Sequence, residues 1–302
     1  MPSTNKKTVS LVLGSGGARG LAHIGVIHWL EENNFKIRSI AGSSMGALIG
    51  GIYAAGKLDE YEQWVRAITK VDMISLLDLS WEKSGVFRGD KLINTLIELV
   101  GDQLIEDLPL SYTAVATDVN GQKEIWIKSG SLFDAIRASI SIPLLFTPFK
   151  YKGVDLIDGG VVNPVPLAST FGDETDMTIA VNLGGPAESP EKLHAVNSAP
   201  ALPSAPVHEK INRFINNLRQ SGTSSSRDWG PYDIAIQAFE AMQNTIARQQ
   251  LAAYPPDVVI EIDRNACRML EFDRASEMIA LGHRKAKECL SQAAAQKQND
   301  ER

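Results

Sequence analysis

Short apolar runs rich in β-branched residues alternate with longer runs of helical periodicity through the first 185 residues of the chain. Apolar runs of about four to eight residues bounded by glycine or polar residues are typical of buried strands, and longer periodic runs are typical of helices. The pattern predicts strands at 9–13, 37–41, 112–117, 124–127, 155–158 and 178–182, and helices near 21–32, 46–55, 58–69, 90–100 and 131–138. This alternation indicates an α/β fold, a layered sheet with helices on both faces.

The pattern changes after residue 185. Residues 186–231 are rich in Pro, Ser, Ala and Asn, a composition that predicts a mobile loop. Periodicity then returns, with a helix at 233–252, a strand at 258–262 and a helix at about 273–291. We therefore expect a core over 8–185, a loop over 186–231, and a helix–strand–helix segment over 232–291 that completes the same domain.

Composition and charge restrict the classes of partner. The chain has 302 residues, 44% of them hydrophobic, which is enough to bury a substantial core. Its formal net charge of −6 argues against a nucleic-acid partner, because such proteins carry a basic face. The two cysteines, Cys267 and Cys289, fit a reducing compartment and stand in no metal-binding or redox spacing.

Neither an export signal nor a membrane span is expected near the start of the chain. Residues 1–7 lead directly into the first strand, and the apolar run that follows is soon broken by glycine. The apolar-rich stretch 11–30 contains glycines, Arg19 and two histidines, which exclude a membrane span. The sequence therefore predicts a cytoplasmic protein.

A G-x-S-x-G box, Gly42-Ser43-Ser44-Met45-Gly46, stands between a predicted strand and a predicted helix. This context favours a nucleophile elbow, in which glycines allow a tight turn and the Ser44 hydroxyl projects above the sheet edge. A helix that starts at Met45 would also aim its N–H groups and positive dipole end at Ser44. The alternative is a plain Gly/Ser loop, since such a box also arises by chance.

A second glycine cluster, Gly14-Ser15-Gly16-Gly17-Ala18-Arg19-Gly20, follows the first predicted strand. A dinucleotide-binding loop fits it poorly, because the third glycine of G-x-G-x-x-G counted from Gly14 falls on Arg19. No acidic ribose ligand stands at the end of the next strand either. The other interpretation is an oxyanion hole built from backbone N–H groups. Parallel neighbouring strands would bring this loop to the same sheet edge as Ser44.

A serine nucleophile needs a base, and the five histidines are poorly placed for that role. They lie on the helix after the glycine loop, in the 186–231 stretch, or on the C-terminal helix: His23, His28, His194, His208 and His283. Only His283 fits a Ser-Asp-His order. Asp158, which is followed by Gly159 and Gly160, is the better candidate, since a partly buried carboxylate has a raised pKa and can take the serine proton directly. The alternative for Asp-Gly-Gly is a hairpin turn.

Together these motifs resemble those of the patatin-like phospholipase family, in particular its bacterial branch related to neuropathy target esterase. The resemblance rests on the glycine cluster 14–20, the box around Ser44, and Asp158-Gly159-Gly160, and it covers about residues 8–185. The segment 138–148 also looks like the family's segment before the aspartate strand. One departure is visible, because Ser15 stands where the family pattern counted back from Gly20 has glycine.

The resemblance implies a patatin-like catalytic core and a serine acyl hydrolase that cleaves acyl ester bonds of lipids through a covalent acyl-enzyme. It implies Ser44 as nucleophile, Asp158 as base, and no metal or organic cofactor. The implied oxyanion hole is the backbone of Gly16, Gly17, Ala18 and Arg19, and the motif glycines are Gly14, Gly20, Gly42, Gly46, Gly159 and Gly160. The Arg19 side chain has two candidate roles, orienting its loop or attracting a phosphate head group, beside plain packing.

Two other functions remain open. One is a hydrolase with a Ser-Asp-His triad, and the other is a regulatory or interaction protein that keeps the fold with little activity. The expected partner of the enzyme is an acyl lipid or ester. Residues 58–87 are rich in aromatic and aliphatic side chains, typical of a helix pair packed on the core. The alternative is an apolar lid over Ser44 that admits acyl chains or transiently contacts a membrane surface.

The composition of 186–231 generates the first testable prediction. Limited proteolysis is expected to cut the native protein first within this stretch, because loops of small polar residues are preferred nicking sites. Mass spectrometry of the earliest fragments measures the cut sites. First cuts clustered inside 8–185 would contradict this domain organisation.

Overall fold

The structure is a computed structural model that describes residues 6–76, 78, 85–187 and 230–300. Most of the loop predicted at 186–231 lies outside the described residues. The chain divides into two compact units, Met1–Pro186 with Gln243–Arg302, and Ala187–Met242. The described part of the second unit is Ala187 and 230–242, which includes the first half of helix α8, Pro231–Ala253. The strands and the other described helices belong to the first unit.

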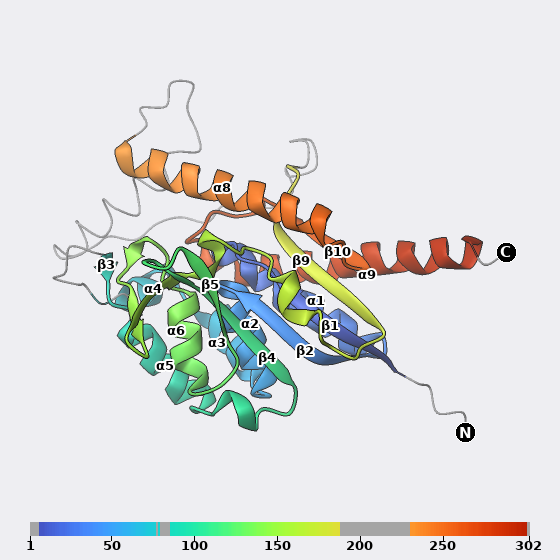
Figure 1. Cartoon of the computed structure of the whole chain (residues 1–302), viewed down its shortest axis with the longest axis horizontal. Helices are drawn as coiled ribbons and strands as arrows, with labels where there is room; N and C mark the ends of the chain where they lie inside the picture. The colour runs from blue at the N-terminus through green and yellow to red at the C-terminus, as the bar shows by residue number, and fades with distance from the viewer. Residues whose placement is uncertain (1–5, 77, 79–84, 188–229, 301–302) are drawn as a thin grey trace. The chain divides into compact units, whose positions relative to one another are not determined.

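A mixed sheet forms the centre of this unit, with strand order β10-β9-β1-β2-β4-β8-β7 and β5 beside β4 (Figure 1). Strands β10, β9, β1, β2 and β4 run parallel to their neighbours, whereas β5, β8 and β7 are joined by antiparallel pairing. Their bounds are β1 Lys7–Leu13, β2 Phe35–Ser43, β4 Ser111–Asp118, β5 Lys123–Ile127, β7 Phe149–Tyr151, β8 Val154–Asp158, β9 Met177–Gly185 and β10 Val258–Asp263.

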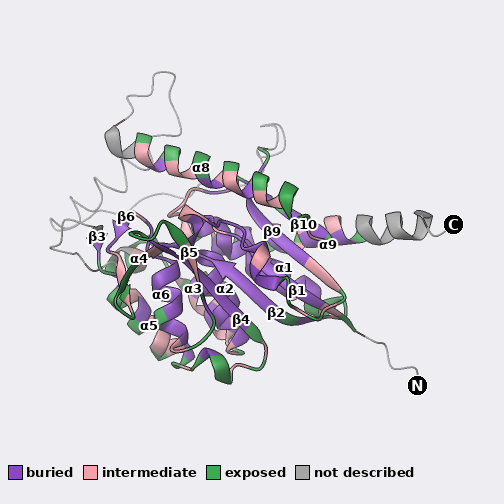
Figure 2. Cartoon of the chain, in the orientation of Figure 1, coloured by how far each residue is buried: buried purple, intermediate pink, exposed green. Residues whose placement is uncertain are grey.

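Helices cover both faces of the sheet, which confirms the predicted α/β fold. The α-helices are α1 Ala22–Glu32, α2 Met45–Ala54, α3 Leu58–Ala67, α4 Lys70–Leu76, α5 Asp90–Val100, α6 Leu132–Ser139, α8 and α9 Ala275–Asp300. Short 3₁₀ turns are η1 Gly17–Leu21, η2 Ile105–Asp107, η3 Gly159–Val161, η4 Leu167–Thr170 and η6 Phe272–Arg274. The central strands and α2 are buried almost throughout, as expected for parallel strands between helices (Figure 2).

Alternate side chains of the central strands pack into two separate hydrophobic cores, one on each face of the sheet. Leu11 and Leu13 of β1 belong to a large core shared with α1, α2, α6 and α9. Val12 lies on the opposite face, in a small core with Ala180 of β9 and Ala247 of α8. Because side chains alternate along a strand, a shift of one residue would exchange the two sets, so these cores fix the register of β1.

Three short strands were not predicted from the sequence. Gly85–Phe87 (β3) and Leu144–Phe146 (β6) pair in parallel as a separate two-stranded sheet, and Phe149–Tyr151 (β7) forms a hairpin with β8. Each has three residues, too few to establish an alternating pattern. The helix predicted at 58–69 ends at Ala67, because Ile68 is extended with φ −63° and ψ 127°, and α4 follows as a second helix.

Helix α9 packs against α1 with its backbone in close approach. A Cβ atom on Gly282 would lie 1.9 Å from the carbonyl oxygen of Ala22, and one on Gly25 would lie 1.9 Å from that of Ile279. Both glycines are therefore required for the two helices to come this close. The contact secures the C-terminal segment, since Met278 and Ala286 of α9 belong to the large core.

This crossing predicts that Gly282→Ala lowers the free energy of unfolding by about 1–3 kcal/mol. The added methyl group would collide with the backbone of Ala22, which cannot move aside as a side chain could. Urea unfolding followed by circular dichroism measures the change. The matched control is Gly172→Ala, where a Cβ atom meets nothing within 4 Å, and its effect is expected to stay within about 0.5 kcal/mol. Equal stability of the two variants would contradict the close crossing.

Candidate active site

Ser44 lies in a sharp turn between strand β2 and helix α2. Strand β2 ends at Ser43, α2 begins at Met45, and Ser44 has φ 54° and ψ −121°. A positive φ is uncommon for a residue other than glycine and costs roughly 1–3 kcal/mol, so it persists only where the surroundings impose it. The strand, strained turn and helix are those expected of a nucleophile elbow.

Two contacts impose this turn. The Ser44 N–H donates to Ser139 Oγ at 2.9 Å, and that hydroxyl donates onward to the carbonyl oxygen of Val115 in β4 at 2.6 Å. Helix α2 also approaches β1 so closely that a Cβ atom on Gly46 would lie 2.0 Å from the carbonyl oxygen of Leu13. The second glycine of the box is thus needed for the helix to start directly above the sheet.

Asp158 reaches Ser44 because β2 and β8 share one edge of β4. Ser43, the last residue of β2, is opposite Val115, and Asp158, the last residue of β8, is opposite the next residue, Ala116. Strand β5 pairs with β4 over both positions and so occupies the other edge. The antiparallel β8 therefore ends where β2 ends, and the carboxyl-terminal residues of the two strands meet.

The Asp158 backbone and one carboxyl oxygen are held by hydrogen bonds. Its N–H donates to the carbonyl oxygen of Ser141 at 2.9 Å, its carbonyl oxygen accepts from Thr117 Oγ1 at 2.9 Å, and its Oδ1 accepts from the Gly160 N–H at 2.7 Å. Ser141 is held in turn by the buried Arg137, whose Nη1 donates to Ser141 Oγ at 2.6 Å. The orientation of the carboxyl is thus fixed by its surroundings.

The second carboxyl oxygen of Asp158 is not held in this way. Oδ2 is buried and has no hydrogen-bond partner of standard geometry in the part of the chain that the structure describes. Burial raises the pKa of Asp158 from 3.8 to about 7, and the nearby Ser44 hydroxyl and the Gly160 N–H oppose this rise. A carboxyl of this pKa is largely ionised just above neutral pH and is then basic enough to accept a proton.

The glycine loop lies at the same sheet edge, since Leu13 at the end of β1 is opposite Gly42 in the parallel β2. The Ala18 N–H donates to the carbonyl oxygen of Met269 at 2.8 Å and so is not free for an oxyanion. Within the described ranges the N–H groups of Gly16 and Gly17 have no acceptor. Of the four predicted donors, the Ala18 N–H thus holds the loop in place, whereas the N–H groups of Gly16 and Gly17 have no described acceptor.

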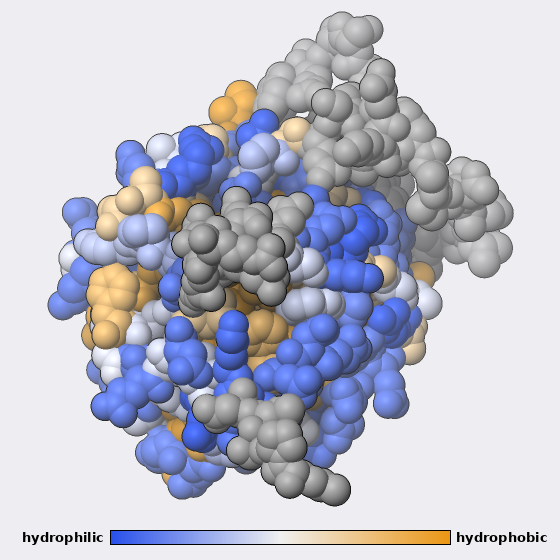
Figure 3. Space-filling model, turned by 90° about the vertical axis from the view of Figure 1, so that its right-hand side faces the viewer, coloured by the Kyte–Doolittle hydropathy of each residue, from blue (hydrophilic) through white to orange (hydrophobic). Residues whose placement is uncertain are grey.

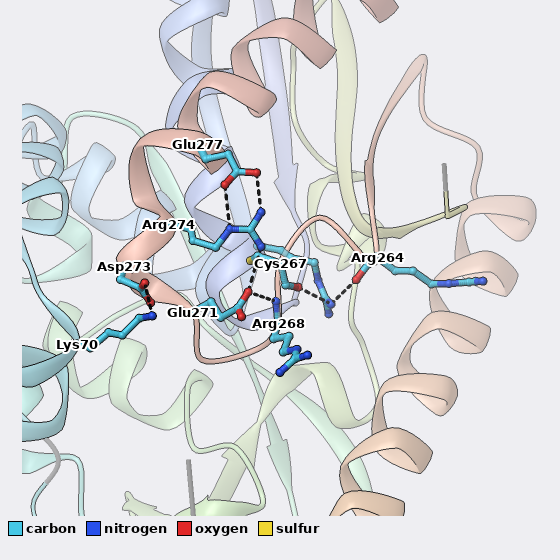
Figure 4. Close-up of polar contacts among 9 residues, drawn as sticks. Lys70, Arg264, Cys267, Arg268, Glu271, Asp273, Arg274 and Glu277 are labelled. Atoms are coloured by element: carbon cyan, nitrogen blue, oxygen red, sulfur yellow. Dashed lines mark hydrogen bonds and ion pairs between the residues drawn. The ribbon is translucent and has the colours of Figure 1, made fainter. Parts of the chain in front are cut away.

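The Arg19 side chain is buried and bonded to backbone carbonyl oxygens, which argues against its binding a phosphate head group. Its Nη1 donates to the carbonyl oxygens of Arg264 at 2.7 Å and Cys267 at 3.4 Å, and both of these partners are labelled in Figure 4. These bonds tie the glycine loop to the segment between β10 and α9. In the same view Arg274 bridges Glu271 and Glu277, and Lys70 of α4 pairs with Asp273 of η6 at 3.1 Å. Of the candidate roles of Arg19, these bonds favour orientation of the glycine loop.

The remaining motif glycines lie in contact with neighbouring segments of the site. A Cβ atom added at each of these glycines would lie within 3 Å of a neighbour: Val181 for Gly14, Met45 for Gly20, Gly46 for Gly42, Val115 and Ser43 for Gly159, and Ser15 and Gln243 for Gly160. The glycine loop, the elbow and the Asp-Gly-Gly turn, far apart in the sequence, thus form one cluster.

None of the three described histidines bonds to Ser44 or Asp158. His23 is fully buried, burial lowers its pKa to about 4, and its Nε2 donates to the carbonyl oxygen of Gly14 at 2.9 Å. His28 pairs with Glu62, and His283 pairs with Glu32 at the end of α1. His194 and His208 lie outside the described residues. The site as described thus contains a serine and a carboxylate without a histidine.

The side chains that support Ser44 and Asp158 carry little signal in the sequence. Ser139 and Ser141 alternate with isoleucine in the segment 138–143, and two serines in an otherwise apolar run are a weak signal of buried hydrogen bonds. Thr117 sits at the end of a predicted strand, where it looks like an ordinary strand residue. Gln243, buried on α8 and bonded to Ser15 Oγ at 3.2 Å, carried no sequence signal.

We also searched the described residues for membrane spans, metal-binding clusters and apolar surface patches. No helix among the described residues is long and apolar enough to cross a bilayer, and no cluster of metal-binding side chains occurs there. The face in Figure 3 is mostly hydrophilic, with hydrophobic side chains in small patches. In the segment 58–87, α3 packs on the core through Leu58, Tyr61 and Val65, while Val71 of α4 is 63% exposed, and residues 77 and 79–84 lie outside the described residues. The lid alternative stays a prediction.

The raised pKa of Asp158 predicts a pH-dependent effect of Asp158→Asn on stability. Between pH 3.8 and about 7 the folded state holds a proton that the unfolded state has lost. The contribution of this carboxyl to the free energy of unfolding is therefore fully present below pH 3.8 and is lost as pH rises through 7. The variant should be more stable than the parent at pH 8, by at most about 4 kcal/mol, and the difference should shrink toward pH 4. Urea unfolding at several pH values measures it, and a difference independent of pH would contradict the buried carboxyl.

The chain matches the family model described as patatin-like phospholipase over residues 11–171. Rv1063c of Mycobacterium tuberculosis, an uncharacterized NTE family protein, is 37% identical over 93% of this chain and 91% of its own length. Human patatin-like phospholipase domain-containing protein 6 is 34% identical over 60% of this chain and 14% of its length. The neuropathy target esterase sws of Drosophila melanogaster is 28% identical over 74% of this chain and 17% of its own length. The chain therefore belongs to the patatin-like phospholipase family.

Proposed function

We propose that this chain is a serine acyl hydrolase that cleaves acyl ester bonds of lipids through a Ser44–Asp158 dyad. One observation carries the proposal: a serine with strained backbone geometry meets, end to end along one strand, a buried aspartate whose carboxyl interacts with the Ser44 hydroxyl. Family membership supports the lipid substrate class, since the matching family model is described as patatin-like phospholipase. Two of the relatives carry the words phospholipase or esterase in their names.

Acylation begins with ionised Asp158. Its carboxylate takes the proton of the Ser44 hydroxyl while Oγ attacks the ester carbonyl carbon, and the carbonyl oxygen becomes an oxyanion. The tetrahedral intermediate collapses, the bond to the leaving oxygen breaks, and Asp158 returns its proton to that oxygen. The products of this stage are a free alcohol and an acyl group on Ser44.

Deacylation repeats these steps with water. Asp158 accepts a proton from a water molecule as its oxygen attacks the acyl carbonyl, and a second oxyanion forms. Its collapse releases the carboxylic acid, and the proton on Asp158 returns to Ser44 Oγ. Both oxyanions are stabilised by the N–H groups of Gly16 and Gly17, which need no reorganisation because the loop is already fixed by Ala18 and Arg19.

Active-site labelling tests the central claim. A fluorophosphonate is expected to label the native protein once, on Ser44, because only an activated serine attacks the phosphorus. Peptide mapping of the adduct identifies the residue. A label on another residue, or none on folded protein, would exclude the hydrolase and favour a regulatory or interaction protein on the same fold.

Variants separate the dyad from a histidine-dependent triad. Asp158→Asn should lower esterase activity by at least the ~10²–10⁴ typical of losing a general base, as should Ser44→Ala. His283→Gln is the control, since His283 pairs with Glu32, and its kcat should stay within a few-fold of the parent. The kcat/KM of the parent should fall as pH drops below about 7, where Asp158 becomes protonated. A folded His283→Gln protein as inactive as Ser44→Ala would exclude the dyad.

A further inference from the structure

We propose that the Ser15 hydroxyl, oriented by Gln243, is a third donor to the oxyanion beside the N–H groups of Gly16 and Gly17. This inference rests on the proposed function and deepens it. It concerns the position at which the chain departs from the glycine pattern of its family, and it adds a side chain to what is otherwise a backbone site.

Ser15 is placed at the reacting edge by contacts on two sides. Its N–H donates to the carbonyl oxygen of Pro164 at 2.8 Å, which fixes its backbone. Its side chain lies against the turn that follows Asp158, since a Cβ atom on Gly160 would be 2.4 Å from Ser15 Oγ. The Gly160 N–H is the group that holds Asp158 Oδ1 at 2.7 Å. The Ser15 hydroxyl therefore lies between the glycine loop and the aspartate turn.

Gln243 determines which way the hydroxyl proton points. Its Nε2 donates to Ser15 Oγ at 3.2 Å, and its side chain is buried. A serine hydroxyl has one proton and two lone pairs, so accepting from Gln243 leaves the proton to be donated elsewhere. No acceptor for this proton occurs among the described residues. Next along the chain stand the N–H groups of Gly16 and Gly17, which likewise have no described acceptor.

Three adjacent donors without acceptors are what an oxyanion hole requires, because the negative oxygen forms only during the reaction and must find its hydrogen bonds already in place. In the ground state the Ser15 hydroxyl remains partly exposed, so water can accept its proton. The contribution of Ser15 should therefore appear in the tetrahedral state and not in substrate binding.

The experiment compares four variants of the full chain: Ser15→Ala, Ser15→Gly, Gln243→Glu and the control Gln249→Glu. The first two remove the hydroxyl, and the second of them restores the family's glycine. Gln243→Glu replaces the donor by an acceptor, which would capture the Ser15 proton. Gln249 lies on the same helix with an exposed side chain, so its change controls for the added charge.

Each variant is assayed with the p-nitrophenyl ester of a medium-chain fatty acid and with an alkyl trifluoromethyl ketone of matching length. The ketone forms an anionic tetrahedral adduct with the nucleophilic serine and so reports on the oxyanion hole separately from turnover. We expect Ser15→Ala, Ser15→Gly and Gln243→Glu to lower kcat about 10- to 100-fold with KM within about threefold, and to weaken the ketone by a similar factor. Gln249→Glu should leave both unchanged.

The outcomes separate this inference from the proposed function. If the parent neither hydrolyses the ester nor reacts with a fluorophosphonate, the proposed function fails and Ser15 has no oxyanion to bind. If the parent is active and Ser15→Gly matches it in kcat and ketone affinity, the role of Ser15 alone is overturned. A loss of activity matched by a lowered melting temperature, with ketone affinity intact, would also overturn it. Should the Ser15 variants not fold, Gln243→Glu carries the same test.

Discussion

The site depends on the way in which β4 shares one of its edges between two strands. Strand β2 pairs with the first part of that edge and β8 with the last part, from opposite directions. A sheet of parallel strands alone would bring loops together at one end, but it would not place the end of a second strand directly against the end of β2 at Ser43 and Ser44. The antiparallel β8 does so, and it needs no loop to carry Asp158 to Ser44.

Burial is the second constraint, and it has opposite effects on folding and on chemistry. A fully buried carboxyl is unfavourable in its ionised form. Hydrogen bonds to the Asp158 backbone and to Oδ1 compensate for part of this cost. The strained backbone at Ser44 is held by the hydrogen bond from its N–H to Ser139 Oγ. The same burial raises the pKa of Asp158 to about 7. In the proposed mechanism, a feature that is unfavourable for the folded state is thus useful to the reaction.

Much of the fold and of the site could be predicted from the sequence because the signals are local. The apolar runs at 9–13 and 37–41 gave β1 and β2, and the glycines after each run identified the loops at their ends. The parts that could not be predicted are set by contacts between distant segments. The bond from Ala18 to Met269, the role of Gln243, and the pairing of β3 with β6 depend on chain geometry that no short motif records.

The support of the glycine loop also has a consequence for the order in which the protein matures. Arg19 is held by the carbonyl oxygen of Arg264, a partner 245 positions later in the chain. During synthesis the N-terminal strands, the elbow and the Asp158 turn leave the ribosome well before that partner exists, and domains generally fold as units. A nascent chain therefore carries the serine and the aspartate for some time without the segment that steadies the loop beside them. The support that Arg19 gives to the glycine loop therefore forms only after Arg264 has been made, later than the residues of the candidate site themselves.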